Sequence, residues 1–279
     1  PSLTQKITVT VSAPMFRVSF TGTKNGVSRM VDYDFQTGKA AEGAELTDMD
    51  GTPIRAGASD LGNYGSLWVQ DQKEGEYRLH KIDPATGKSV FDSDVSKVGN
   101  KAQPKLFNDF AYDDGDSTTS DSEWIFATDG EGHVWCTQNR EEPNTMKYVV
   151  ESESAPTNFI GMTFGKSFEI DETRFYPAYY LEIGSNQLVV NNFSYNIMTG
   201  WSSTYTNCTL STHLTYQTDA NGRYMDTLTY DPVTNSPILF HYIADSTYDV
   251  YWINLDTTSR TAAMLNLGTI TGYTDVSGY

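Results

Sequence analysis

Hydrophobic and polar residues alternate with a period of two along most of this chain, which is the pattern of a β-strand with one buried face. The stretch YRLHKIDPATGKSV at residues 77–90 is an example: an alternating run meets the turn sequence DPATG, and a second run follows. We therefore predict two strands joined by a tight turn at residues 83–87. Residues 166–176 have some helical character, but no apolar stripe with helical spacing sustains it. The alternation predicts an all-β fold.

The same arrangement of strand, turn and strand recurs elsewhere in the sequence. Similar stretches occupy residues 28–41, 132–150, 186–203 and 249–264. Their turns begin with Asp or Asn, whose side chain can accept hydrogen bonds from the backbone just ahead, and several contain a Gly that tolerates a positive φ. Between these hairpins lies a second motif, a short strand of small and aromatic residues followed by a polar turn. We take Phe107, Phe159, Met225 and Ile270 as its markers.

The spacing of these markers, roughly 45 to 66 residues, fits a unit of four strands with variable loops, close to the period of propeller blades. Units are predicted at residues 53–103, 104–156, 157–222 and 223–268. The N-terminal region supplies only three strands, so we expect residues 269–276 to provide its missing inner strand. The prediction is an all-β β-propeller over residues 14–279, with five blades favoured and closed by pairing of N- and C-terminal strands. A six-bladed ring and a β-sandwich are the alternatives, and the repeated inner-strand markers argue against the sandwich.

The unit at residues 223–268 resembles the repeats of extracellular bacterial β-propellers, which carry a Tyr-Asp-x-x-Thr-Gly turn and an aromatic-x-Ile-Asn-Leu-x-Thr-Gly run. The matching residues are Tyr230, Asp231, Thr234, Tyr251, Ile253, Asn254, Leu255 and Thr257. Asn235 and Ser259 stand where Gly is commoner, and Asn tolerates a positive φ better than Ser does. The resemblance covers about residues 54–275 and is strong only in this last unit. It implies a propeller fold and a secreted or cell-surface setting, and it carries no catalytic residues.

Residues 1–13 contain the alternating Ile7, Val9 and Val11, which resemble the closing strand of bacterial Ig-like surface domains. They are expected to be either the end of an upstream module or an edge strand of the propeller. Because the chain begins at Pro1, we expect a processed product or a piece of a longer protein.

Charge and cysteine content narrow the class of protein further. The formal net charge is -17, which repels phosphate backbones, so no nucleic-acid partner is expected. No apolar run approaches the roughly 18 residues of a membrane span. Cys136 and Cys208 form neither a disulfide framework nor a zinc motif. They are expected to be buried thiols, with a single bridge as the alternative.

Three acidic loops are the candidates for a metal site. They contain Asp48 and Asp50, Asp114 and Asp116, and Asp219 with Asn221. Calcium requires several oxygen ligands that converge in one loop, and none of the three fits the EF-hand spacing. Solvated turns are therefore the favoured interpretation. No cofactor is expected, and calcium is the candidate if one of these loops binds an ion.

Catalysis by a nucleophile is not expected, because there is no Gly-x-Ser-x-Gly motif and the four histidines fall in four different predicted units. A glycoside hydrolase would need two carboxylates in the central funnel of the propeller. Asp109, Asp226 and Asp60 lie near the starts of predicted inner strands and are the candidates. The competing interpretation, that they bind backbone groups at a crowded axis, is favoured.

Ligand binding is the favoured function, because loops on a rigid scaffold commonly carry it. Aromatic residues gather in the longest insertion: Tyr176, Tyr179, Tyr180, Trp201, Tyr205 and Tyr216. Aromatic rings suit the faces of sugars and the centres of protein interfaces. The sequence thus predicts a secreted or cell-surface module for adhesion or binding, with a glycan or a protein on a host or neighbouring cell as partner. A funnel hydrolase and a structural spacer are the alternatives.

Overall fold

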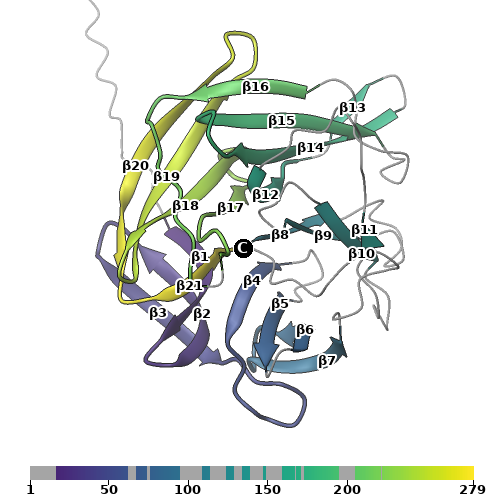
Figure 1. Ribbon diagram of the computed structural model, residues 1–279, viewed down its shortest axis with the longest axis vertical. Helices are drawn as coiled ribbons and strands as arrows, with labels where there is room; N and C mark the ends of the chain where they lie inside the picture. Colours follow the sequence, from purple (N-terminus) through teal and green to yellow (C-terminus); the bar gives the residue numbers. More distant parts are fainter. Residues whose placement is uncertain are drawn as a thin grey trace, which may run out of the picture.

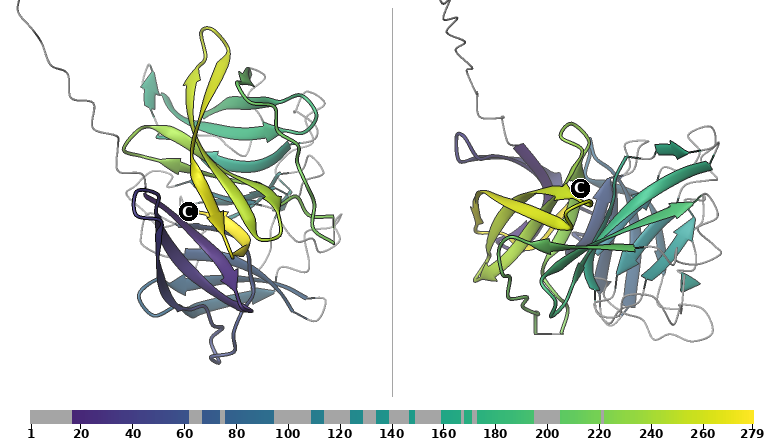
Figure 2. Two further views of the ribbon diagram at one scale, coloured as in Figure 1. Left: turned by 90° about the vertical axis from the view of Figure 1, so that its left-hand side faces the viewer. Right: turned by 90° about the horizontal axis from the view of Figure 1, so that it is seen from above.

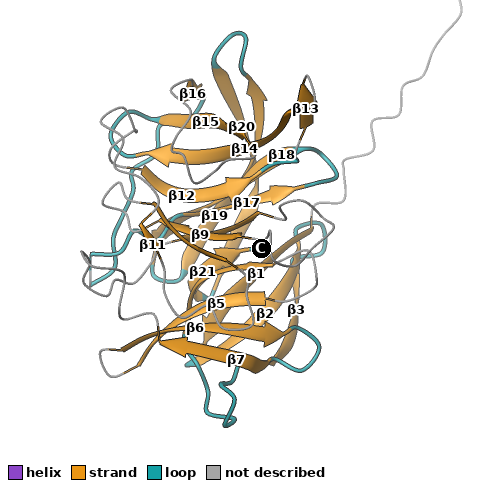
Figure 3. Ribbon diagram, turned by 90° about the vertical axis from the view of Figure 1, so that its right-hand side faces the viewer, coloured by secondary structure: helices purple, strands orange, loops and turns teal. Residues whose placement is uncertain are grey.

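The computed structural model describes residues 17–61, 67–73, 76–94, 109–113, 124–128, 134–138, 147–148, 159–166, 168–170, 173–194, 205–220 and 222–279. Within these ranges the regular secondary structure consists of β-strands, as Figure 3 shows. The same ranges contain no helix that is long and apolar enough to cross a membrane. The prediction of an all-β fold is therefore confirmed for the described part of the chain. The predictions for residues 1–13 lie outside it.

The strands form sets of four that run antiparallel to one another, and we call each set a unit. One unit contains β4 (Ala56–Leu61), β5 (Leu67–Lys73), β6 (Glu76–Asp83) and β7 (Lys88–Asp94). The next contains β8 (Asp109–Asp113), β9 (Trp124–Thr128), β10 (Val134–Gln138) and β11 (Lys147–Tyr148). The third contains β12 (Phe159–Phe164), β14 (Thr173–Glu182), β15 (Gln187–Ser194) and β16 (Tyr205–Leu210), with the short β13 (Phe168–Ile170) paired to β14.

Two further units contain the C-terminal and N-terminal strands. One consists of β17 (Thr227–Asp231), β18 (Ser236–Ala244), β19 (Thr247–Asp256) and β20 (Thr261–Thr271). In the other, the C-terminal β21 (Thr274–Gly278) pairs with β1 (Arg17–Lys24), followed by β2 (Val27–Asp34) and β3 (Lys39–Glu45). Figure 2 shows β20 and β21, in yellow, beside the purple strands β1 to β3.

The first strands of neighbouring units lie against one another. β4 contacts β8, β8 contacts β12, β12 contacts β17, and β17 and β4 both contact β21. Seen down the shortest axis, the units spread outward from this centre, as Figure 1 shows. A radial arrangement of four-stranded antiparallel sheets is the architecture of a β-propeller.

One predicted strand has a different place in the structure. Residues 269–276 were expected to form one inner strand, but Ile270 belongs to the end of β20 and pairs with Tyr248. Gly272, which has a φ of 83°, turns the chain before β21 begins at Thr274. Ile270 is therefore not an inner-strand marker, because the turn separates it from the strand that pairs with β1.

Two neighbouring units are joined at their outer strands, which the sequence did not predict. β16 pairs with β20 in parallel, with Thr209 opposite Thr261 and Leu210 opposite Ala262. The amide of Thr209 donates to the carbonyl of Arg260 at 3.0 Å, and the amide of Ser211 donates to the carbonyl of Ala262 at 2.9 Å. This pairing covers part of two outer edges that would otherwise expose backbone groups to other chains.

An apolar core fills the space between these two joined units. Its buried residues come from both: Ile160, Leu181, Leu188, Val190, Cys208 and Leu210 face Leu228, Leu239, Ile253 and Ala262. Burial of apolar surface on this scale is the main force that holds the two sheets together.

The predicted turns have the expected hydrogen bonds. The carboxylates of Asp34, Asp83, Asp231 and Asp256 each accept hydrogen bonds from amides two or three residues ahead. The positive φ comes four residues after each carboxylate, at Gly38, Gly87, Asn235 and Arg260. The assignment of Ser259 to the glycine position was therefore wrong by one residue, because the left-handed conformation falls on Arg260.

Gly87 has a second reason to be glycine. Its carbonyl accepts a hydrogen bond from the amide of Thr47 at 2.9 Å, so the turn lies against the connection that follows β3. A Cβ atom at position 87 would come 2.4 Å from the carbonyl oxygen of Glu45. The turn at residues 83–87 thus joins two units as well as two strands.

Candidate functional site

Asp109, one of the predicted funnel carboxylates, ties together three first strands. It begins β8 and is completely buried. Its Oδ2 atom accepts a hydrogen bond from the amide of Met162 on β12 at 2.9 Å, and one from the amide of Leu228 on β17 at 2.7 Å. Gly161, with a φ of 66°, precedes the first of these amides and lies close to the carboxylate. A buried carboxylate with two amide donors is well stabilised where it is.

Hydroxyl groups make similar links among the first strands β4, β17 and β21 and the adjacent strand β1. The amide of Ser59 donates to Ser277 Oγ at 2.9 Å, and this hydroxyl donates to the carbonyl of Ser59 at 3.1 Å. Thr21 Oγ1 and Ser59 Oγ lie 2.7 Å apart, and the amide of Gly278 donates to Thr227 Oγ1 at 3.4 Å. Polar side chains near the axis therefore bond to neighbouring strands, as buried polar groups must.

Asp226, the second predicted carboxylate, is completely buried and forms a close hydrogen bond with His241 Nδ1 on β18. Burial raises the pKa of the Asp226 carboxyl above its ordinary value, and the hydrogen bond and charge of His241 oppose this shift only partly. The ring of Tyr216 meets the imidazole edge-on, with centroids 6.2 Å apart. Burial, and then the charge of Asp226, raise the pKa of Tyr216. The partner His241 was missed, although it lies in the same predicted unit as Asp226.

A second buried histidine has a comparable partner. His80 Nδ1 lies 2.7 Å from Asp92 Oδ1, and the hydroxyl of Ser89 donates to the same carboxylate. Burial raises the pKa of Asp92, but these hydrogen bonds and the charge of His80 outweigh it and leave the pKa below its ordinary value. Both histidines thus orient and hold a carboxylate inside the fold.

Asp60, the third predicted carboxylate, lies on β4 and is half-buried. Its Oδ1 atom accepts a hydrogen bond from the amide of Leu61 at 2.8 Å. Of the three candidates, Asp109 and Asp226 are closed off from solvent. A general acid or base must reach the substrate, so these two carboxylates are poorly placed for glycoside hydrolysis in this structure.

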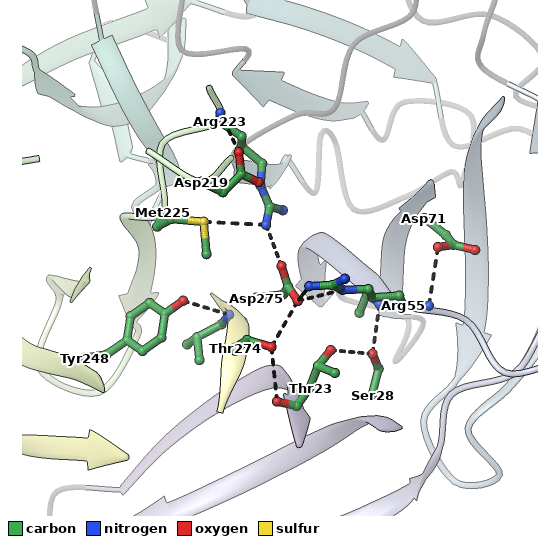
Figure 4. A network of polar contacts seen from close by, with 12 residues as sticks. Thr23, Ser28, Arg55, Asp71, Asp219, Arg223, Met225, Tyr248, Thr274 and Asp275 are labelled. Atoms are coloured by element: carbon green, nitrogen blue, oxygen red, sulfur yellow. Dashed lines mark hydrogen bonds and ion pairs between the residues drawn. The ribbon is translucent and has the colours of Figure 1, made fainter. Parts of the chain in front are cut away.

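A charged network, shown in Figure 4, joins the ends of three units where β4, β17 and β21 begin. Asp275 on β21 is at its centre. Arg223 Nη2 lies 2.6 Å from Asp275 Oδ1, and Arg55 Nε and Nη2 lie 3.0 Å and 2.9 Å from Asp275 Oδ2. The Arg223 guanidinium also contacts Asp219 Oδ2 at 3.3 Å. Arg223 and Asp275 are buried, whereas the Arg55 side chain is 69% exposed.

Two of the predicted metal ligands, Asp219 and Asp48, accept hydrogen bonds from backbone amides of their own loops. The Oδ1 atom of Asp219 accepts the amide of Arg223 at 2.9 Å, and Asp48 Oδ1 accepts the amides of Asp50 and Thr52 at 3.0 Å and 2.7 Å. No group of three or more metal-binding side chains occurs in the described ranges. Asp114, Asp116 and Asn221 lie outside those ranges.

The predicted aromatic residues whose side chains are described have different surroundings. Tyr179 and Tyr180 are neighbours on β14 and therefore point to opposite faces of the sheet, and both are buried. Tyr179 stacks on Tyr230 with centroids 6.0 Å apart, and burial followed by the charge of Tyr230 raises its pKa. Neither ring is free to meet a ligand that docks on the loops. Tyr216 packs against His241.

Of the other aromatic candidates, Tyr205 is 41% exposed at the start of β16. Tyr176 lies on β14, but its side chain is outside the description, and so is the whole of Trp201. Cys208 is a free, buried thiol whose pKa is raised by burial, while the side chain of Cys136 is also not described.

Comparison with known proteins adds little to this picture. No protein-family model and no curated protein sequence matches the chain. Among solved structures, a GH43_1 enzyme from Xanthomonas citri shares 9% identity over 92% of this chain and 93% of its own, with a TM-score of 0.45. Virginiamycin B lyase from Staphylococcus aureus shares 11% over 94% and 87%, with a TM-score of 0.43.

The β-propeller domain of Swd1 from Myceliophteria thermophila shares 10% identity over 92% of this chain and 73% of its own, with a TM-score of 0.38. These neighbours include enzymes and a domain that is named only for its fold. At such low identity and TM-score the likeness carries no inference about function.

Proposed function

We propose that this chain is a five-bladed β-propeller module of a secreted or cell-surface protein, and that it binds a glycan or protein ligand. The pairing of β21 with β1 and the succession of contacts among the first strands support the blade number. The net charge of -17 argues against nucleic acid as the ligand. No metal or other cofactor is needed for this function.

The observation that favours binding over hydrolysis is that the buried carboxylates already form hydrogen bonds within the protein. Asp109 accepts two backbone amides from other units, and Asp226 is held by His241. A glycoside hydrolase needs two carboxylates that reach the scissile bond from opposite sides. Carboxylates that are already committed to the fold are better explained as structural supports for a binding scaffold.

A hydrolase is the second candidate, for one specific reason. A carboxyl with a raised pKa is what a general acid requires, and Asp226 has a raised pKa. If the fold opened to admit substrate, Asp226 would be the residue to test. The third candidate, a structural spacer, predicts no ligand at all.

Three measurements on the folded chain separate these functions. Binding is screened on glycan and protein arrays, and Tyr205→Ala is compared with the control Leu265→Ala, because both side chains are exposed but lie on different strands. Binding that is lost only in Tyr205→Ala supports the proposal, whereas failure to bind any ligand would favour the spacer. Release of reducing sugar by the wild type that disappears in Asp226→Asn would establish the hydrolase instead.

A further inference from the structure

The unit that contains β14, β15 and β16 has one face with unpaired amide side chains. Strand pairing places Ala178, Asn191 and Tyr205 in one row across these strands, and Tyr180, Val189 and Asn207 in the next row. Residues that oppose each other in an antiparallel pair share a face, and so do residues two positions apart. Asn191, Asn207 and Tyr205 therefore lie on the same face, and we call these three residues the amide face.

The amide face is distinct from the core between the two joined units. Leu188, Val190 and Cys208 lie on the same strands but at the alternate positions, and they belong to that core. The amide face consequently points away from the β17–β20 unit and toward the β8–β11 unit. In the same row, Phe164 pairs with Ala178 and its ring contacts Phe126 of β9, with centroids 5.1 Å apart. Figure 1 shows β16 at the outer side of its unit, far from the C-terminus at the centre.

Asn191 is completely buried, yet its Nδ2 and Oδ1 atoms have no hydrogen-bond partner within the described structure. The Oδ1 atom of Asn207 is buried and unpartnered in the same way. Buried amides nearly always have partners, because removal from water without a new hydrogen bond is unfavourable. Two such groups on neighbouring strands of one face indicate a place where a partner from outside the chain would bind.

The third member of the amide face lies at the boundary with solvent. Tyr205 lies directly opposite Asn191 and is 41% exposed, so the row passes from a buried amide to an exposed ring. An amide offers both a donor and an acceptor, which matches a pair of sugar hydroxyls, and an aromatic ring can cover the apolar face of a sugar. Ala178, on the other side of Asn191, is small and adds no polar group.

The charge of the amide face narrows the class of ligand. Its three residues and their row neighbours Ala178, Tyr180 and Val189 are all uncharged side-chain types, in a chain whose formal net charge is -17. A charged ligand would find no countercharge among these residues, and its desolvation would not be compensated. A neutral, hydroxyl-rich ligand offers the hydrogen-bond donors and acceptors that the unpaired amides lack.

We infer that the amide face is a binding subsite for a neutral oligosaccharide. Asn191 and Asn207 form the hydrogen bonds, and Tyr205 supplies the ring against which a sugar stacks. The inference rests on the proposed binding function and specifies its ligand and its site. A sugar must reach Asn191 past Tyr205, so the ring also controls entry to the buried amide.

The test compares Asn191→Leu with the wild type on immobilised cellohexaose, maltohexaose and xylohexaose, with sialylated and sulfated glycans alongside. Leucine has a similar shape and removes the unpaired amide, so binding to a neutral hexasaccharide should fall at least about tenfold while the melting temperature stays level or rises. Tyr205→Phe should keep binding and Tyr205→Ala should lose it. Thr206→Ala, the next residue on the opposite face, is the control and should bind normally.

Each other outcome decides against the site. Wild-type affinity in both Asn191→Leu and Tyr205→Ala would overturn the amide face while leaving the binding function intact. If the wild type binds only charged glycans or proteins, the amide face is likewise overturned as an oligosaccharide subsite and the binding function stands. Absence of any ligand would overturn the proposed function as well. If Asn191→Leu fails to fold, Tyr205→Ala decides, because its side chain is exposed and contributes little to the core.

Discussion

Asp109→Ala should lower the free energy of unfolding by about 3–6 kcal/mol. The lost side chain accepts two backbone amides, and a hydrogen bond to a charged group contributes about 1.5–3 kcal/mol each. The amides of Met162 and Leu228 would be left without that acceptor near the axis. Against a total stability of about 5–15 kcal/mol for a domain, such a loss would leave the fold marginal.

The assay is urea unfolding followed by tryptophan fluorescence and circular dichroism. Asp34→Ala is the matched control, because Asp34 also accepts two backbone amides, from Gln36 at 2.8 Å and Thr37 at 3.2 Å, but in an exposed turn. It should shift the urea midpoint far less, and Asp109→Asn, which keeps an acceptor oxygen, should be intermediate. Equal shifts for the two alanine variants would refute the reasoning that burial makes this carboxylate essential. A stability gain in Asp109→Asn would point to a functional carboxylate instead.

Three other substitutions test the fold and its charges. Gly38→Ala should lower the free energy of unfolding by about 1–2 kcal/mol, because residue 38 has a positive φ. Gly87→Ala should lower it by about 1–3 kcal/mol more, because only a side chain at position 87 would meet the backbone of another unit, and equal urea midpoints would contradict this. Arg223→Met should lower stability by about 1–3 kcal/mol, since the buried Asp275 keeps only its ion pair with the exposed Arg55 and its Oδ1 atom loses a charged hydrogen-bond donor; Arg55→Met should cost less in the same unfolding assay. Because the pKa of Asp226 is raised in the folded state, the stability that this group contributes is fully present below its ordinary pKa of 3.8. That stability is lost as the pH rises through the folded-state pKa. The melting temperature of Asp226→Asn minus that of the wild type should therefore increase from about pH 4 to about pH 7, and a decrease would show that the bond to His241 outweighs burial.

The strands and turns were largely predictable, because their signals are local. The alternation at residues 77–82 corresponds to β6 (Glu76–Asp83), and the Asp that opens a turn is visible in the sequence. The exceptions are turn positions that are occupied by a residue type that is uncommon there. Arg260 adopts the positive φ that Gly usually supplies, and at residues 182–186 a Glu opens the turn while Asn186 has the positive φ. Residue type alone does not identify such positions, since the surrounding strands impose the conformation.

The candidate sites were harder to predict, because their partners are far away in the sequence. Asp109 bonds to amides 53 and 119 residues further along the chain, a relation that no local pattern contains. The aromatic residues were grouped by their proximity in the sequence, although period-two alternation already implies that Tyr179 and Tyr180 cannot share a face. Asn191 and Asn207 carry no motif, so their significance appears only when their faces and their missing partners are known.

The contrast between the axis and the amide face suggests where this protein acts. Near the axis, Asp109 and Ser277 are buried, and the bonds that they make connect first strands to one another, so their polarity is explained by folding alone. Asn191 is equally buried, but within the described structure its amide bonds to nothing, and folding alone would be better served by an apolar residue of the same shape. A polar group that disfavours folding needs a different explanation, and a ligand supplies one. If Asn191→Leu is more stable than the wild type but no longer binds the oligosaccharide, the gain in stability at the expense of binding identifies the functional surface.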